Sequence, residues 1–204
     1  MIFYACDSRS ASSVEILKRN GWGRLFCAEV SKPYDGEHWA VDNGAYKSWQ
    51  DGTEWNGKDF MDRIEKQMKI GNPDFAVVPD IPTKGLDSLK FSLDWREKLT
   101  NDWKWYLAIQ DGMSVDVVES VIGLFDGLFL GGSNRFKGEA EKFCNLAHRY
   151  EKKFHYARAS TRKRIHHARR VGADSIDSAF PFWIENRRKI VEQALIEPLP
   201  IELL

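Results

Sequence analysis

The chain alternates short apolar runs with longer segments of helical periodicity, and this alternation limits its possible folds more than any other feature. Apolar runs typical of buried strands lie at residues 2–7, 24–30, 39–42, 75–80, 105–110, 127–130, 154–158 and 173–177. Helices are expected at residues 10–20, 58–70, 86–99, 114–123, 138–150, 161–171 and about 181–195. The sequence therefore predicts an α/β fold, a compact single-domain (β/α)8 TIM barrel spanning residues 1–204.

One segment departs from the regular alternation. Residues 39–58 form the main irregularity, and this connection is expected to be a functional loop. A doubly wound open sheet is the alternative fold, but the first expected strand is not followed by a glycine-rich dinucleotide-binding turn. No linker or break in composition divides the chain, so one domain is expected.

Composition excludes several classes of protein. The formal net charge is +0, so any nucleic-acid surface must come from local basic patches. No apolar run reaches the ~20 residues of a membrane span, and no secretory signal is visible. Cys6, Cys27 and Cys144 lie far apart without a zinc-binding spacing, which indicates reduced thiols and a cytoplasmic location. Neither a metal nor a cofactor is expected.

Polar residues recur where the expected strands end. They are Asp7, Asp42-Asn43-Gly44, Asp80, Gln110-Asp111-Gly112, Gly131-Gly132-Ser133, Arg158 and Asp177. Each has a simpler explanation as a turn or a helix entry. In a barrel, however, all the carboxyl ends of the strands converge on the face that carries active sites. The joint pattern therefore predicts a site made of aspartates, a glutamine and glycines.

These residue types fit a purine. Asp80 can accept hydrogen bonds from the N1–H and N2–H2 edge of guanine, and Gln110 can donate to O6. The backbone of Gly131 and Gly132 can approach a base edge closely because no Cβ intervenes. A further aspartate can attack a sugar C1′, as carboxylate nucleophiles do in glycosyl transfer, while a second carboxylate moves protons.

The stretch from Gly172 to Phe180 contains two aspartates in an otherwise apolar segment. On its own, the simplest interpretation is that Asp177 caps the following helix and that Asp174 pairs with an arginine. As the eighth strand end, Asp177 becomes the candidate nucleophile. Asp174 is then left with a supporting role, such as holding Arg158.

Five blocks of sequence carry a resemblance to a known family. They are Val41-Asp42-Asn43-Gly44-Ala45-Tyr46, Val78-Pro79-Asp80, Ala108-Ile109-Gln110-Asp111-Gly112, Phe129-Leu130-Gly131-Gly132 and Ala173-Asp174-Ser175-Ile176-Asp177. In this order the blocks resemble the tRNA-guanine transglycosylase superfamily. They are most similar to its DNA-acting branch, the deazapurine DNA-modification transglycosylases of phages and bacterial modification islands.

The resemblance implies a role for each matched residue. Asp177 would be the nucleophile and Asp42 would assist proton transfer. The base would be bound by Asp80, Gln110, Gly131, Gly132 and Asn43. The implied reaction exchanges guanine in DNA for a 7-deazaguanine, such as 7-cyano-7-deazaguanine, through a covalent aspartyl-glycosyl intermediate. The implied location is the cytoplasm, which is the host cytoplasm if the protein is phage-encoded.

The chain also departs from the family pattern. No Cys or His follows Asp177, whereas the tRNA enzymes carry a Cys/His zinc module there. No separate zinc module is therefore expected, and DNA is favoured over tRNA as the partner. Ala45 also stands where the family has a second glycine.

A basic stretch and several aromatics lie near the expected site. Arg158, Arg162, Lys163 and Arg164 are expected to contact the nucleic-acid backbone, although a solvated helix face is the simpler alternative. The aromatics Trp49, Trp55, Phe182 and Trp183 are expected in loops, where they either stack on a flipped base or pack as a lid. His148 and His155 are expected to be structural.

Three alternative functions stay open at the level of sequence. The first is the same base exchange on tRNA. The second is a glycosidase that releases a base and inserts none. The third is a barrel that binds purines or nucleic acid without catalysis. No membrane partner is expected, whereas partner proteins and a homodimer are both left open.

Overall fold

The computed structural model describes residues 1–6, 10–27, 32–178 and 184–200. In these residues the strands pair in parallel, in chain order, and close into a barrel. The strands are β1 (Ile2–Cys6), β2 (Gly23–Phe26), β3 (Trp39–Val41), β4 (Phe75–Val77), β5 (Trp105–Ile109), β6 (Gly127–Leu130), β7 (Lys153–Tyr156) and β8 (Ser175–Ser178). The predicted (β/α)8 barrel is confirmed.

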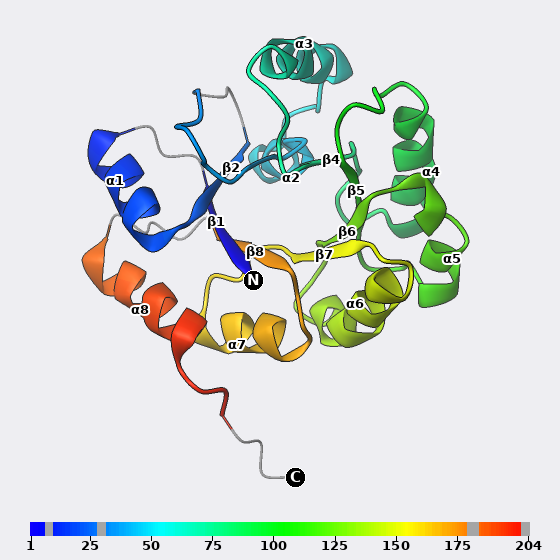
Figure 1. Ribbon diagram of the computed structural model, residues 1–204. Helices are drawn as coiled ribbons and strands as arrows, with labels where there is room; N and C mark the ends of the chain where they lie inside the picture. The colour runs from blue at the N-terminus through cyan, green and yellow to red at the C-terminus, as the bar shows by residue number, and fades with distance from the viewer. Residues whose placement is uncertain (7–9, 28–31, 179–183, 201–204) are drawn as a thin grey trace.

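Helices surround the strands as an outer ring (Figure 1). The α-helices are α1 (Ala11–Asn20), α2 (Ala45–Asp51), α3 (Gly57–Met68), α4 (Gly85–Arg96), α5 (Val115–Glu119), α6 (Ala140–Arg149), α7 (Arg162–Arg170) and α8 (Glu185–Ile196). Two 3-10 helices are η1 (Ile122–Leu124) and η2 (Phe136–Glu139). Within the described ranges, no helix has the length and apolar character needed to cross a membrane.

Several helices begin at the residues that capping chemistry favours. The Ser10 side chain accepts from the backbone N–H of Ser13, and Gly21 ends α1 in the left-handed conformation. The Thr161 side chain caps α7 in the same way by accepting from Arg164 N–H. These caps fix where α1 and α7 begin.

The barrel interior is filled by large side chains from alternate strand positions. Tyr4, Phe75 and Tyr106 are buried there, and the rings of Phe75 and Tyr106 stack at 4.4 Å. Gly23 and Gly127 make room for this layer, because a Cβ at either position would lie under 3 Å from the ring of Tyr4 or Tyr106 respectively. The amino-terminal part of the barrel is therefore a packed core, which leaves the carboxyl ends of the strands to form a site.

Some predicted boundaries differ from the structure. The expected functional loop over residues 39–58 contains the short helix α2, which starts directly after Gly44 in the left-handed conformation. The helix expected over residues 114–123 is divided into α5 and η1. The expected strand 75–80 ends at Val77, so Asp80 lies in the segment that follows it. Residues 28–30 of the second expected strand and 181–183 of the last expected helix lie outside the described residues.

Candidate active site

Three of the predicted aspartates gather at the carboxyl ends of the strands. Asp42 directly follows β3, Asp80 follows β4, and Asp177 lies in β8. Burial is the largest cause that raises the pKa of Asp42, and the negative charge of Asp177 raises it further. Asp42 in turn contributes to the raised pKa of Asp80. Asp42 therefore lies within electrostatic reach of both Asp177 and Asp80.

Asp177 is held firmly through one of its two oxygens. Its side chain is buried, and Oδ1 lies 2.9 Å from both His155 Nε2 and the backbone nitrogen of Arg158. No described residue donates a hydrogen bond to Oδ2. One carboxylate oxygen is thus anchored, while the other has no donor among the described residues.

His155 was expected to be structural, and the structure gives it a specific task in orienting Asp177. The buried imidazole lies between Ser175 Oγ, 2.8 Å from Nδ1, and Asp177 Oδ1. Its ring also stacks on Phe129 with centroids 4.7 Å apart. The alternation of side chains along β7 is the signal that could have located it, because His155 points inward and contacts Tyr4 and Phe75. His155 therefore fixes the orientation of Asp177.

Asp42 is fixed by its own turn and by an arginine that the sequence did not single out. The backbone N–H of Gly44 donates to Asp42 Oδ1 at 2.6 Å. Arg63 of α3 donates to the carbonyl oxygens of Asp42 and Cys27, at 2.9 and 2.8 Å. The nearby guanidinium and the Gly44 hydrogen bond both oppose the rise in the pKa of Asp42, although burial outweighs them.

Asp80 accepts hydrogen bonds from two buried amides. Asn43 Nδ2 donates to Oδ1 at 2.8 Å, and Gln110 Nε2 donates to Oδ2 at 2.9 Å. Burial nevertheless raises the pKa of Asp80 to about 6. Because each carboxylate oxygen has two lone pairs, both oxygens can still accept from a ligand. Asp80 therefore keeps hydrogen-bond acceptor capacity on both oxygens.

Gln110 and Asn43 differ from their predicted roles as direct base contacts. The two amide hydrogens of Gln110 point to Asp80 and Ser88, and its Oε1 accepts from Thr83 N–H at 2.5 Å. Asn43 also donates to Val78 O and accepts from Ala45 N–H. Since their polar atoms are already engaged, both amides position Asp80.

The two glycines after β6 differ in how their backbone N–H groups are used. The N–H of Gly131 is used in the sheet, where it donates to Ile109 O at 2.9 Å. Gly132 has a φ of 69°, and a Cβ there would lie 2.7 Å from the Phe136 ring and 2.8 Å from Asp111 Oδ2. Among the described residues, the Gly132 N–H has no acceptor. Of this predicted pair, Gly132 is the one that can present a backbone donor to a ligand.

Arg158 lies at the centre of the site in a strained conformation. It has a φ of 55°, which is costly for a residue other than glycine and is often found at functional sites. Its guanidinium donates to Gly132 O at 2.5 Å and lies 4.3 Å from the centroid of the Tyr46 ring. The backbone and side chain of Arg158 therefore link β8, the turn after β6 and helix α2.

The other three basic residues are placed differently from one another. Arg164 hydrogen-bonds to Asn134 and to Arg158 O, so it lies beside the site. Arg162 instead pairs with Gln193 and Glu197 at the end of α8. Lys163 is exposed on the first turn of α7. Arg158, Lys163 and Arg164 can thus face a phosphate backbone, whereas Arg162 braces the neighbouring helix.

Asp174 does not hold Arg158, contrary to expectation. Its carboxylate accepts from Lys153 Nζ and Phe154 N–H at 2.8 Å and lies 2.9 Å from His148 Nε2. It precedes β8, at the amino-terminal end of the barrel. Asp174 is therefore a structural anchor remote from the site.

A pocket of about 290 Å³ adjoins Asp80. It is lined by Ala45, Ser48, Trp49, Thr53, Trp55, Asp80, Ile81, Pro82 and Phe91. Trp49 is half exposed, whereas Trp55 packs against Phe60 and Trp95 and donates to Asn43 O. Of the two predicted stacking aromatics that the structure describes, Trp49 is thus the available one. Asp7, Phe180, Phe182 and Trp183 lie outside the described residues.

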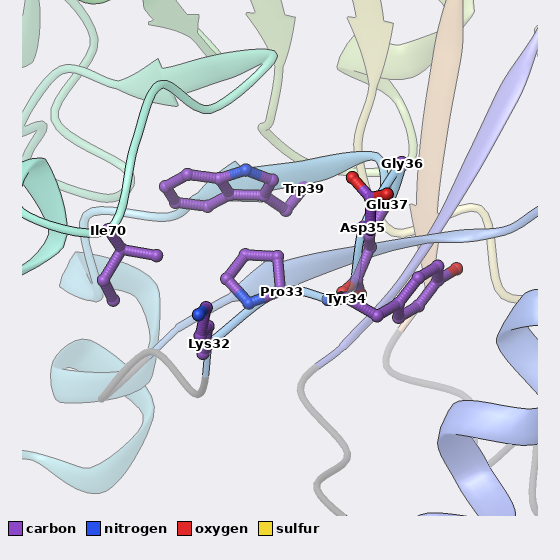
Figure 2. A pocket seen from close by; sticks show the side chains of 8 residues that line it. All are labelled: Lys32, Pro33, Tyr34, Asp35, Gly36, Glu37, Trp39 and Ile70. Atoms are coloured by element: carbon purple, nitrogen blue, oxygen red, sulfur yellow. The ribbon is translucent and has the colours of Figure 1, made fainter.

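Figure 2 shows the residues that line a larger hollow of about 470 Å³, and none of the three carboxylates is among them. Its walls include Lys32, Tyr34 and Trp39, the first residue of β3. It therefore opens near the amino-terminal end of that strand. Because barrel enzymes carry their chemistry at the opposite end, we place the site at the carboxyl ends of the strands.

Two thiols lie close together on the rim. Cys6 ends β1 and Cys27 follows β2, and their side chains are hydrogen-bonded. This hydrogen bond, followed by burial, holds the pKa of Cys27 well above its usual range. In the part of the chain that the structure describes, no three His, Cys, Asp or Glu side chains are placed so that they could hold a metal ion together.

Among known proteins, no family model and no curated protein matches this chain. The transglycosylase resemblance of the five sequence blocks therefore stays an expectation from the sequence. The barrel is common among enzymes and carries many chemistries, so its function must be argued from the site itself.

Proposed function

We propose that this protein is a guanine transglycosylase that exchanges guanine in DNA for a 7-deazaguanine base, such as 7-cyano-7-deazaguanine. The observation that carries the proposal is that two carboxylates, Asp177 and Asp42, lie in different environments. Asp177 is anchored through Oδ1 and leaves Oδ2 available, whereas burial raises the pKa of Asp42. Such unequal environments assign one carboxylate to nucleophilic attack and the other to proton transfer.

The proposed reaction has two displacements at the same carbon. Asp177 Oδ2 attacks C1′ of a flipped deoxyguanosine, the C1′–N9 bond breaks, and guanine leaves with a proton from Asp42. The incoming deazaguanine then loses its N9 proton to the Asp42 carboxylate. Its N9 attacks C1′, and the bond to Asp177 breaks to regenerate the free carboxylate.

The groups around these carboxylates supply base recognition. Asp80, held by Asn43 and Gln110, can accept from the N1–H and N2–H2 edge of guanine. The adjoining pocket of about 290 Å³ is near the lower limit of ~300 Å³ for small-molecule sites, which suits a single base. The Gly132 N–H and the ring of Tyr46, which both lie next to Arg158, can add a polar and a flat apolar contact.

DNA is the preferred acceptor in this proposal. Arg158, Lys163 and Arg164 offer positive charge beside the site of a chain with no net charge. A guanine must leave the duplex to reach Asp177, because the carboxylate is buried at the barrel mouth. Trp49 offers an exposed ring for a neighbouring base.

The direct test supplies the protein with 7-cyano-7-deazaguanine and either DNA or tRNA, followed by mass spectrometry of the nucleosides. We expect the deazaguanine deoxynucleoside in DNA with the native protein and none with D177A. Incorporation into tRNA alone would overturn the choice of DNA. Release of free guanine without incorporation would make the protein a glycosidase, and no change in either acceptor would contradict the proposal.

A further inference from the structure

Lys137 is a buried lysine that the proposed reaction does not use. It lies in η2, after β6, with only 3% of its surface exposed. Fully buried lysines are rare because their charge is costly away from water. Its Nζ donates a hydrogen bond to Ala157 O and lies 4.7 Å from the centroid of the Tyr156 ring. Such a residue calls for an explanation beyond packing.

The acceptor of this hydrogen bond belongs to the peptide group that holds the nucleophile. Ala157 O and Arg158 N–H are the two polar ends of a single peptide unit. Its oxygen accepts from Lys137, and its N–H donates to Asp177 Oδ1 at 2.9 Å. Hydrogen bonds in series polarise one another, so charge at Lys137 strengthens the donor that faces Asp177.

The charge on Lys137 is variable near neutral pH. Burial is the main cause that lowers the pKa of its ammonium group to about 7, and the positive charges of Arg158 and Arg164 contribute. The negative charge of Asp177 acts in the opposite direction. Among the described residues, the charges that act on Lys137 belong to Arg158 after β7, Arg164 of α7 and Asp177 of β8. The Tyr156 ring covers it as well.

We propose that Lys137 is a positioning residue that controls Asp177 through the peptide between Ala157 and Arg158. The chemical part of this inference rests on the proposed transglycosylase function. When Lys137 is charged, it favours the free carboxylate of Asp177 over the uncharged glycosyl ester. When Lys137 is neutral, this preference weakens and the ester is held longer. Lys137 thus adjusts the balance between attack and release.

The structural link can be tested without any activity. Labelling alanine with ¹³C at the carbonyl and arginine with ¹⁵N selects the amides of Arg158 and Arg169, because Ala-Arg occurs at 157–158 and 168–169. In the native protein, the Arg158 amide proton should move upfield as pH rises, with a midpoint of about 7. Arg169, inside α7, serves as the internal reference.

Two substitutions remove the titration in different ways. K137M lacks the charge, and K137R keeps it at every pH because arginine does not deprotonate in proteins. In both variants the Arg158 signal should lose its titration near neutrality. An unchanged titration in K137M, or no titration in the native protein, would overturn the inference. The native measurement decides the question even if a variant fails to fold.

The catalytic consequence is read separately, as the fraction of protein trapped as a DNA adduct at a pH below neutrality. We expect K137M to hold severalfold more adduct than the native protein. The matched control is K142M, whose exposed lysine pairs with Glu139 outside the site and which should match the native protein. A titrating Arg158 signal without any base exchange would reject the proposed function and leave the structural link intact. Equal adduct in K137M and native protein would reject the catalytic part.

Discussion

At the scale of single residues, the site depends on carboxylates that sit in different environments. Asp177 accepts two hydrogen bonds on one oxygen, and Asp80 accepts hydrogen bonds from two amides. The pKa of Asp42 is raised mainly by burial. Three chemically identical groups thereby acquire three different tasks. The environment of each one, and not its residue type, decides what it can do.

The raised pKa of Asp80 gives a prediction for stability. Burial raises this pKa to about 6, so the folded state binds the Asp80 proton more tightly than the unfolded state does. This contribution to stability is present at low pH and is lost as pH rises through about 6. Because D80N has no carboxyl group, its melting temperature relative to the native protein should rise between acidic and neutral pH. Thermal unfolding of both proteins at the two pH values measures this difference, and a constant difference would contradict it.

The positions of these aspartates were predictable, whereas the roles of their neighbours were not. Asp42, Asp80 and Asp177 end apolar runs, and a barrel brings such ends together. Whether an amide is free depends on partners far along the chain. Gln110, for example, also donates to Ser88 and accepts from Thr83 N–H, and these contacts orient its amide toward Asp80. No local pattern in the sequence reports such contacts.

His155 and Lys137 were missed for a related reason. His155 meets Asp177 only because β7 and β8 pair in a particular register, with His155 beside Ser175. Lys137 reaches Ala157 O from a 3-10 helix that follows another strand. Both contacts are set by tertiary structure and not by residue spacing.

At the scale of elements, the turn after β6 is the most constrained part of the site. Gly132 combines a positive φ with close neighbours on both sides, because Phe136 and Asp111 leave no room for a Cβ. Asp111 is itself held by Ser133, whose N–H and hydroxyl donate to it. This turn therefore requires glycine for two independent reasons.

A matched pair of glycine substitutions tests this requirement. G132A should lower the free energy of unfolding by roughly 1–3 kcal/mol, because strain and a steric clash act together. G138A, in the adjoining η2, meets no atom within 4 Å and should be neutral or stabilising by up to about 1 kcal/mol. Urea unfolding of both variants gives the comparison. Equal effects would show that the turn is not constrained as described.

Long helices were predicted more successfully than short ones. The strongly periodic segment 58–70 corresponds to α3, because its apolar face packs on the barrel. In contrast, α2 was not predicted, since its seven residues carry no long periodic pattern and begin after a left-handed glycine. Short elements of this kind depend on the turn before them more than on their own composition.

At the scale of the whole molecule, the barrel separates stability from chemistry. Tyr4, Phe75 and Tyr106 fill its interior, and the carboxylates lie at the carboxyl ends of the strands. The alternation of apolar runs and helices was enough to predict this architecture. It could not predict which side chains would fill the barrel interior. The need for glycine at positions 23 and 127 follows only from the tyrosine rings that pack against them.

The charge distribution over the molecule predicts how DNA binding depends on salt. The chain has no net charge, so affinity should come from the basic side chains near the site. K163A should weaken DNA binding about equally for all sequences and reduce the slope of log K against log salt by about 1. K66A removes an exposed lysine from the last turn of α3, which contributes no residue to the basic group beside the site, and should leave the slope unchanged. Fluorescence anisotropy at several salt concentrations measures both slopes, and equal slopes for the two variants would contradict this placement of the DNA.

The central claim is that Asp177 forms a covalent bond to a sugar. The most direct measurement incubates the protein with an end-labelled, guanine-containing DNA, denatures the mixture, and maps the cross-linked residue by mass spectrometry. The native protein should give an adduct at Asp177, D42N should give less of it, and D177N should give none. An adduct that persists in D177N, or that maps to another residue, would contradict the account.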